Sequence, residues 1–382
     1  MTKTSPDLIS MMSQLIAIPS VSCMRPELDM SNEAVIDLLA NWLESSGFHV
    51  DKQAVAAGKF NLIATIGQGS DGLILSGHTD TVPFDDVLWT SDPFTLSERD
   101  NRLYGLGSCD MKSFLAMAIQ ASQQFKKEQY KRPLTIIATA DEETTMFGAR
   151  MIADNGRKLG KYCVIGEPTN LIPVREHKGI IMESVRFKGS SGHSSNPALG
   201  NNAMEAMHEF MHHLLIYRQH LQDKYQNPAF EVSTPTLNLG HIHGGDNPNR
   251  ICGECELHID LRFLPGMKIE DLRHDIQELA KKVARARDQQ VEFDALFMGI
   301  PAMHTDSDSL LNQYLEEMTR TKSQSVAFGT EAPFYNEIGC ETIVMGPGSI
   351  NQAHQPDEFL PMDQIQPTVH LLQQLIQRFC IT

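Results

Sequence analysis

Residue types that bind metal ions recur along this chain at or just after short apolar runs. They comprise two histidines and several carboxylates: His78, Asp80, Asp110, Asp141, Glu142, Glu143, Glu167 and His354. The apolar runs have the length and composition of β-strands. Because an open α/β sheet gathers its ligand site at the carboxyl ends of its strands, the pattern favours an α/β fold in which these side chains meet.

The first 180 residues alternate strand-like and helix-like segments. The strand-like runs are residues 61–66, 72–76, 134–139 and 162–165. Helical periodicity of apolar residues is clear over 35–43 and 114–125, and a further helix is expected near the N-terminus, with Ser5 as its N-cap and Pro6 in its first turn. This alternation predicts a mixed sheet flanked by helices.

The middle of the chain follows a different order. Strands and helices are predicted there in the order strand 180–188, helix 202–225, strand 234–241, strand 254–263, helix 269–283 and strand 291–296. The segment 254–263 alternates strictly between apolar and polar residues, as a half-buried strand does. The order β-α-β-β-α-β is that of a ferredoxin-like domain.

Helix and strand signals of the first kind resume after residue 296, with a helix over 309–320, a strand over 341–345 and His354 just beyond. The gap between Glu167 and His354 is also far longer than any other gap between neighbouring ligand candidates. We therefore expect one domain made of residues 1–180 and 293–382, with residues 181–292 inserted into it as a ferredoxin-like domain.

The balance of charges excludes some partners. The chain has 48 acidic and 32 basic residues and a formal net charge of −16, which argues against nucleic acid and anionic membranes as partners. No apolar run approaches the ~18 residues of a membrane span. Seven cysteines in irregular positions indicate reduced thiols and a cytoplasmic location. A lone C-x-x-C at Cys252 and Cys255 lacks the second pair of a structural zinc site.

The ligand candidates match the requirements of a two-metal hydrolase. Zinc accepts histidine nitrogen and carboxylate oxygen, and cobalt suits the same ligands. Two metals about 3.5–4 Å apart need a group that contacts both, and Asp110 is the candidate bridge. Three carboxylates and one hydroxide would balance the charge of two divalent cations, so the site could be buried at acceptable cost.

The remaining carboxylates have candidate roles beside the metals. Glu142 and Glu143 are adjacent, so one can bind a metal while the other acts as general base on a nearby water. Asp80 follows His78 by two residues and is expected to accept the second ring N–H of that histidine. Taken alone, a His-x-Asp in a loop is uninformative, and a Glu-Glu pair is usually a solvated part of the surface. The prediction becomes specific because all of these parts lie at predicted strand ends.

Several motifs are similar to those of the dinuclear zinc peptidase and aminoacylase family. They are G-H-T-D-T-V-P, G-L-G-S-C-D-M-K, A-D-E-E, G-E-P-T, S-G-H-S-S and A-H-Q-P-D-E, and the resemblance extends over essentially the whole chain. It implies an amide hydrolase that uses two Zn²⁺ ions, with Co²⁺ as a possible substitute. The implied ligands are His78, Asp110 and Glu167 for one ion and Asp110, Glu143 and His354 for the other.

The same resemblance implies further roles. Glu142 becomes the general base, Asp80 the partner of His78, and the inserted domain the dimerisation domain of a homodimer. His193 is implied to lie near the active site of the neighbouring subunit, where it would stabilise an oxyanion. One departure is visible, because the family usually has glycine where this chain has Ser113. Serine is acceptable there if the position is the first turn of a helix.

The implied substrate is a small N-acyl amino acid. Arg262 is our candidate for binding its carboxylate, because guanidinium matches carboxylate geometry, with Asn249 assisting. Glu331 is a candidate for binding a side-chain ammonium. The motifs leave open whether the enzyme is a deacetylase, a desuccinylase, an aminoacylase or a dipeptidase. A non-catalytic metal-binding protein is the remaining alternative, although neither a ligand nor the base is missing.

Overall fold

The computed structural model describes residues 6–382, and the contacts within it divide the chain into two compact units. The large unit comprises the chain up to Arg175, His304–Gln324 and Thr330–Thr382, and the small unit comprises Glu176–Met303 and Ser325–Gly329. The small unit thus extends beyond the predicted insertion at both ends, because the segments that flank residues 181–292 pack with it.

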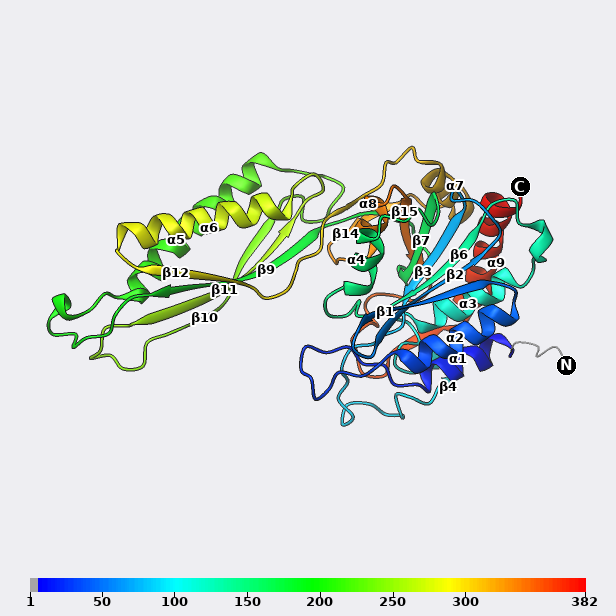
Figure 1. Ribbon diagram of the computed structural model, residues 1–382, viewed down its shortest axis with the longest axis horizontal. Coiled ribbons are helices and arrows are strands. Elements are labelled where there is room, and N and C mark those ends of the chain that lie inside the picture. The colour runs from blue at the N-terminus through cyan, green and yellow to red at the C-terminus, as the bar shows by residue number, and fades with distance from the viewer. Residues whose placement is uncertain (1–5) are drawn as a thin grey trace. The chain divides into compact units, whose positions relative to one another are not determined.

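The large unit is built on a mixed sheet (Figure 1). Its strand order is β1-β2-β6-β3-β7-β15-β8-β13, with β14 paired to β8. The strands are β1 (His49–Ala56), β2 (Lys59–Ile66), β3 (Leu73–His78), β6 (Leu134–Thr139), β7 (Tyr162–Pro168), β8 (Val174–His177), β13 (Met303–His304), β14 (Gln324–Val326) and β15 (Glu341–Gly346). Strands β6, β3, β7 and β15 are mutually parallel, whereas β1, β2 and β8 pair in antiparallel fashion.

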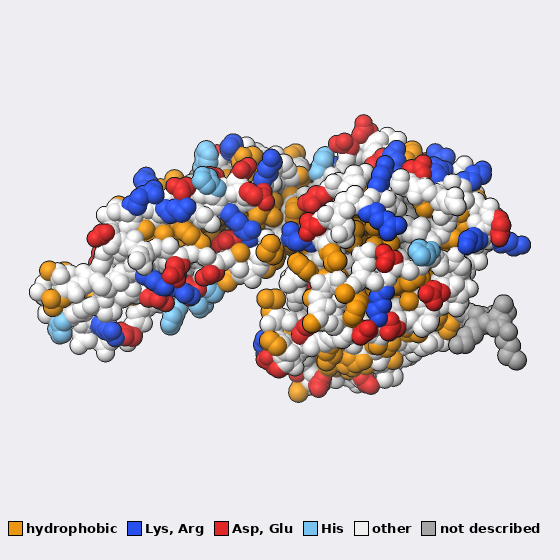
Figure 2. All heavy atoms as spheres, viewed as in Figure 1, with side chains coloured by type: hydrophobic (Ala, Val, Ile, Leu, Met, Phe, Trp, Pro, Cys, Tyr) orange, Lys and Arg blue, Asp and Glu red, His pale blue; other side chains and the backbone are white. Residues whose placement is uncertain are grey.

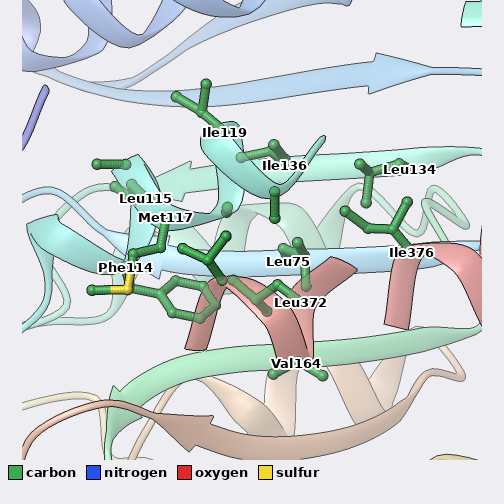
Figure 3. Packing of buried hydrophobic residues seen from close by; sticks show 14 of the residues in the cluster. Leu75, Phe114, Leu115, Met117, Ile119, Leu134, Ile136, Val164, Leu372 and Ile376 are labelled. Atoms are coloured by element: carbon green, nitrogen blue, oxygen red, sulfur yellow. The ribbon is translucent and has the colours of Figure 1, made fainter. Parts of the chain in front are cut away.

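Helices cover both faces of this sheet, which confirms the predicted architecture. They are α1 (Leu8–Ile16), α2 (Glu33–Ser45), α3 (Lys112–Ser122), α4 (Phe147–Asp154), α7 (Leu310–Thr319), α8 (Ala332–Glu337) and α9 (Ile365–Ile376). Figure 3 shows Phe114 and Leu115 of α3 and Leu372 of α9 packed against Leu75 and Val164 of the sheet. This core fixes the central parallel strands, whose ends carry the candidate site.

The first helix begins later than predicted. Ser5 lies outside the described residues, and the N-cap of α1 is Asp7, whose carboxylate accepts a hydrogen bond from the backbone N–H of Ser10 at 3.1 Å. Pro6 therefore precedes the cap instead of occupying the first turn. Asp is as good an N-cap as Ser, so Asp7 can begin the helix two residues later than predicted.

A short ribbon lies beside the large sheet and was not predicted. Strands β4 (Ser97–Arg99), β5 (Arg102–Tyr104) and β16 (Phe359–Pro361) pair in the order β16-β5-β4. All three are antiparallel and only three residues long, too short for a clear alternation of apolar and polar residues. The ribbon joins the segment after His354 to the segment before Asp110.

The small unit has the predicted ferredoxin-like order of elements. They are β9 (Gly179–Lys188), α5 (Ala203–Lys224), β10 (Thr236–Gly244), β11 (Glu254–Phe263), α6 (Ile269–Ala286) and β12 (Gln290–Ala295). The strands form an antiparallel sheet in the order β10-β11-β9-β12, and Figure 1 shows α5 and α6 on the same face of it. The apolar side chains of β11, predicted to share one face, are all buried in this unit's core.

The surface carries charges of both signs. Figure 2 shows acidic and basic side chains interspersed over the visible face of both units. None of the helices described for residues 6–382 combines the length and the apolar character that crossing a lipid bilayer requires.

Candidate metal centre

Neighbouring parallel strands of the large sheet present the predicted ligands at their carboxyl ends. His78 is the last residue of β3, Glu167 lies near the end of β7, and Glu142 and Glu143 follow the end of β6 at Thr139. Because β6, β3 and β7 are adjacent and parallel, these ends lie side by side. The fold thus gathers the side chains at the edge where α/β sheets bind ligands.

Two further ligand candidates come from loops. Asp110 lies just before α3, and the peptide bond from Asp110 to Met111 is cis. His354 lies between β15 and β16 and has a positive φ of 61°, as does Asp141 at 59° beside the glutamate pair. Both loops contribute side chains to the same cluster as the strand ends.

His78, Asp110 and Glu167 form one group whose ligand atoms lie within 4.8 Å of one another. Nε2 of His78 is 3.0 Å from Oδ1 of Asp110 and 3.9 Å from Oε1 of Glu167. All three side chains are buried. Ligand atoms on one tetrahedral zinc lie about 3.4 Å apart, given Zn–ligand distances of ~2.0–2.2 Å, so the group has the spacing of a zinc site.

Asp110, Glu143 and His354 form a second group of the same kind. Nε2 of His354 is 3.0 Å from Oε2 of Glu143 and 3.8 Å from Oδ2 of Asp110. The two oxygens of Asp110 therefore face different histidines, Oδ1 toward His78 and Oδ2 toward His354. A carboxylate that bridges two metals needs this arrangement.

Glu142 stands beside both groups. Its carboxylate, with His78 and Glu143, also offers atoms that lie within 4.8 Å of one another. Burial, and next the charge of Glu167, raise the pKa of Glu142 well above its usual value. A carboxylate with a raised pKa next to a hydrolytic metal centre is suited to accept and return a proton.

The electrostatics of the cluster fit bound cations. Burial and the charge of Asp110 raise the pKa of Glu143, and raise that of Glu167 well above its usual value. Burial alone would lower the pKa of His78, but Asp110 and Glu167 raise it well above the ordinary value. Oε1 of Glu167 is buried without a hydrogen-bond partner among the described residues. Two divalent cations would offset this negative charge and provide a partner for that oxygen, so the residues fit a two-metal centre.

The carboxylate of Asp80 does not bind His78 as the sequence suggested. Nδ1 of His78 is 2.9 Å from the backbone oxygen of Asp80 but 3.9 Å from its carboxylate, which is too far for a hydrogen bond. The carboxylate instead accepts a hydrogen bond from the backbone N–H of Glu143 at 3.0 Å. The backbone carbonyl therefore sets the ring orientation of His78, and the Asp80 side chain holds the loop of Glu143.

Two supporting carboxylates had no role in the sequence prediction: Glu358, which was not singled out, and Asp141, which was named only as one of the metal-binding residue types. Glu358 is buried and accepts three backbone N–H bonds from the loop that carries Asp110. Asp141 accepts a hydrogen bond from Ser22 at 3.0 Å and pairs with Lys59 at 3.0 Å, which anchors the loop of the glutamate pair. Their signal was their place in A-D-E-E and A-H-Q-P-D-E, but only the tertiary structure shows what they hold.

Ser113 meets the condition that the sequence set for it, and Cys109, next to Asp110, is a packed thiol. Ser113 lies in the first turn of α3 and is not among the residues with positive φ, so its departure from the family pattern leaves the loop unstrained. Cys109 is buried, and burial with the charges of Glu358 and Asp110 raises the pKa of its thiol well above the usual value. The thiol therefore stays protonated and packs against the loop.

The candidates His193, Asn249 and Arg262 all lie in the small unit. The exposed loops of His193 and Asn249 are neighbours, because the backbone oxygen of Asn249 accepts a hydrogen bond from Ser194. Arg262 lies near the C-terminal end of β11, where its Nε donates to both carboxylate oxygens of Asp260 at 2.9 and 3.2 Å. Within a single subunit, therefore, Arg262 does not lie next to His193 and Asn249.

Glu331 lies at the N-terminus of α8 and is completely buried. Its Oε2 accepts a hydrogen bond from Thr139 at 2.9 Å, and burial raises its pKa to about 7 even though the charge of His78 lowers it. This buried position beside Thr139 favours a supporting role over direct contact with a substrate ammonium.

Known proteins are similar to this chain over nearly its whole length. The chain is 49% identical to an acetylornithine deacetylase from Proteus mirabilis over 98% of this chain and 97% of the relative. It is 48% identical to one from Photorhabdus laumondii over 99% of this chain and 98% of the relative.

Solved structures share the fold at low sequence identity. An aminopeptidase PepT from Bacillus cereus is 18% identical with a TM-score of 0.76, covering 97% of this chain and 98% of its own. A dinuclear metal-binding peptidase of the M20 family from Bacillus subtilis is 16% identical with a TM-score of 0.67, covering 97% of both chains. The model of the peptidase family M20/M25/M40 matches residues 74–378. This chain therefore belongs to the peptidase family M20/M25/M40.

Proposed function

We propose that this chain hydrolyses N2-acetyl-L-ornithine to L-ornithine and acetate, a step of arginine biosynthesis. The observation that carries the proposal is the joining of two ligand groups through Asp110, with Glu142 beside them and not needed as a ligand in either group. The choice of substrate is supported by relatives named acetylornithine deacetylase that are 47–49% identical over nearly the whole chain.

We assign the ligands of the two cations from the same groups. One cation would be held by His78, Asp110 and Glu167, and the other by Asp110, Glu143 and His354. The mixture of histidine nitrogen and carboxylate oxygen favours Zn²⁺, with Co²⁺ as a substitute. When bound, such cations polarise an amide carbonyl and lower the pKa of a water molecule.

The protein's own groups would then move the protons. Glu142 accepts the proton of the attacking water and passes it to the nitrogen of the leaving amine. The raised pKa of Glu142 suits this exchange, because the group must both take and return a proton. His193, from the neighbouring subunit of a dimer, would stabilise the negative charge that develops on the acetyl carbonyl oxygen when water adds to the carbon. Arg262, with Asn249, would bind the substrate carboxylate.

The homodimer in this proposal is supported by features of the small unit. Strand β10 is the end strand of its sheet and has exposed side chains, including Ile242 at 50% exposure. Helix α5, which packs against β10, exposes Leu215 and Ile216. An end strand with apolar neighbours is suited to pair with its own copy about a twofold axis.

The location proposed is cytoplasmic, since all seven cysteines are free thiols.

A comparison of substrates tests the function. Zinc-loaded protein would be assayed with N2-acetyl-L-ornithine, N-succinyl-diaminopimelate and a dipeptide. We expect kcat/KM to be at least about tenfold higher for acetylornithine, equivalent to ~1.4 kcal/mol of selective transition-state binding. A preference for either other substrate would reassign the specificity within the family. Failure to hydrolyse all three with both metals bound would contradict a hydrolase.

A further inference from the structure

The carboxylate of Glu358 is enclosed by the loop that carries Asp110. Only 2% of this residue is exposed. Its Oε1 accepts hydrogen bonds from the backbone N–H groups of Cys109 at 2.7 Å and Asp110 at 2.9 Å, and its Oε2 accepts one from Gly107 at 3.0 Å. Both oxygens are thus used as acceptors by one short stretch of backbone.

The backbone around Glu358 is tied to the same stretch. The carbonyl oxygen of Glu358 accepts a hydrogen bond from the N–H of Gly105 at 3.1 Å, and the next residue, Phe359, pairs with Tyr104 across β16 and β5. His354 lies four residues before Glu358. The segment 354–358 therefore supplies the ligand candidate His354 at one end and, at the other, accepts hydrogen bonds from the loop of Asp110.

We propose that Glu358 is a positioning residue that sets the direction of the Asp110 carboxylate and its distance from His354. The proposal rests on the two-metal site inferred above. Glu358 contacts Asp110 only through the backbone N–H of that residue and is a member of neither group of ligands. Asp110 must place its oxygens toward two different histidines, 3.0 Å and 3.8 Å away, so a small rotation of its loop would disturb both metal positions. Residues that orient metal ligands commonly change metal affinity or activity 10–100-fold when replaced.

The substitution Glu358→Gln separates positioning from simple filling of space. Glutamine has the same size, and its neutral side chain costs less to bury than a carboxylate. Its amide nitrogen, however, cannot accept a bond and would face a backbone N–H. We expect apparent zinc affinity, measured by competition with a chromophoric chelator, to fall about 10–100-fold. Because Asp110 is common to both groups, we expect both sites to weaken and activity to recover when free zinc is raised.

The neighbouring Asp357→Asn is the matched control. Its carboxylate binds Thr90 on the protein surface, so zinc affinity is expected to stay within about twofold of wild type. Glu358→Asp keeps two carboxyl oxygens on a shorter arm and should lose less zinc affinity than Glu358→Gln.

Wild-type zinc affinity in Glu358→Gln would overturn the proposal. If that variant does not fold, wild-type affinity in Glu358→Asp would overturn it equally. Zinc titration uses no substrate, so it tests the role of Glu358 separately from the proposed activity. Zinc affinity can depend on Glu358 even if the protein does not hydrolyse acetylornithine, and it can be independent of Glu358 even if the protein does.

Discussion

At the scale of single residues, the neighbours of a carboxylate decide its role. Asp110 is buried, which would raise its pKa, yet its hydrogen bond to His78 lowers the pKa below the usual value and keeps the group ionised as a bridge. Glu142 makes no such hydrogen bond to any of residues 6–382, and burial raises its pKa well above the usual value. These opposite pKa shifts agree with the roles proposed for Asp110 as a metal ligand and for Glu142 as a proton carrier.

Replacing Glu142 by Gln tests the role of proton carrier. Glutamine has nearly the same shape but cannot accept the proton of the attacking water, so kcat is expected to fall about 10²–10⁴-fold. The assigned ligands are untouched, so zinc content should remain about two per chain. Atomic emission and turnover measurements check both, with Glu128→Gln on the surface as control. Turnover near that of wild type with zinc retained would exclude Glu142 as the base.

Replacing Arg262 by Lys tests carboxylate binding. Lysine keeps the charge but loses the planar pair of donors, so KM is expected to rise about tenfold, or ~1.4 kcal/mol, with a smaller change in kcat. The control is Arg186→Lys, which changes a residue of the adjacent strand β9 that pairs with Glu256. An equal rise in KM for both variants would indicate a general effect on the small sheet, and no rise would remove Arg262 from the binding site.

At the scale of elements, the periodicity of apolar residues predicted those strands whose side chains are buried in the core. Strand β6 and strand β11 match their predicted ranges because their side chains are buried on both faces or on alternate faces. Strand β1 was not predicted, since it is largely exposed and depends on pairing with β2. Strands β4, β5 and β16 were missed because each is only three residues long and formed by tertiary contact.

The end of helix α7 allows a test of stability against pH. Burial would raise the pKa of Glu316, but its hydrogen bonds with Lys322 and with the backbone and hydroxyl of Ser323 lower it to about 2. A lowered native pKa contributes stability above the unfolded value of 4.5, and the contribution is lost as pH falls toward 2. Glu316→Gln should therefore cost about 1.5–3 kcal/mol at pH 7 and progressively less below pH 4.5.

Urea unfolding at several pH values measures this difference. Glu317→Gln changes the next residue, which is exposed, and should alter the unfolding midpoint little at any pH. A Glu316→Gln penalty that stays constant between pH 7 and pH 3 would show that the ionised carboxylate is not its source.

At the scale of the whole molecule, the clustering of the ligand candidates was predictable but its support was not. His78, Asp110, Glu167 and His354 could be chosen from their residue types and their positions at or after predicted strands, whereas only the family resemblance selected Glu143 over Glu142 as a ligand. Other features depend on which segments meet in space. They are the hydrogen bond from the loop of Glu143 to the Asp80 side chain, the burial of Glu331, and the hydrogen bonds from the loop of Asp110 to Glu358. Such contacts leave no periodic signal along the chain.

The proposed dimer makes a prediction at this scale. Ile242→Lys places a charge on the end strand β10, so the molecular mass measured by light scattering should fall from dimer to monomer. Activity should fall with it, because His193 is proposed to act on the neighbouring subunit. Leu296→Lys, just beyond the opposite end strand β12, is the matched control and should remain dimeric. Dissociation by the control alone would place the interface at the other edge.

Removal and return of the metal test the central claim most directly. Protein stripped by a chelator would be titrated with zinc while bound metal and acetylornithine hydrolysis are followed together. We predict that stripped protein is inactive and that activity is restored as zinc binds, reaching its maximum at about two ions per chain. Full activity in protein shown to contain no metal, or saturation of activity at one ion with a second never bound, would contradict the two-metal account.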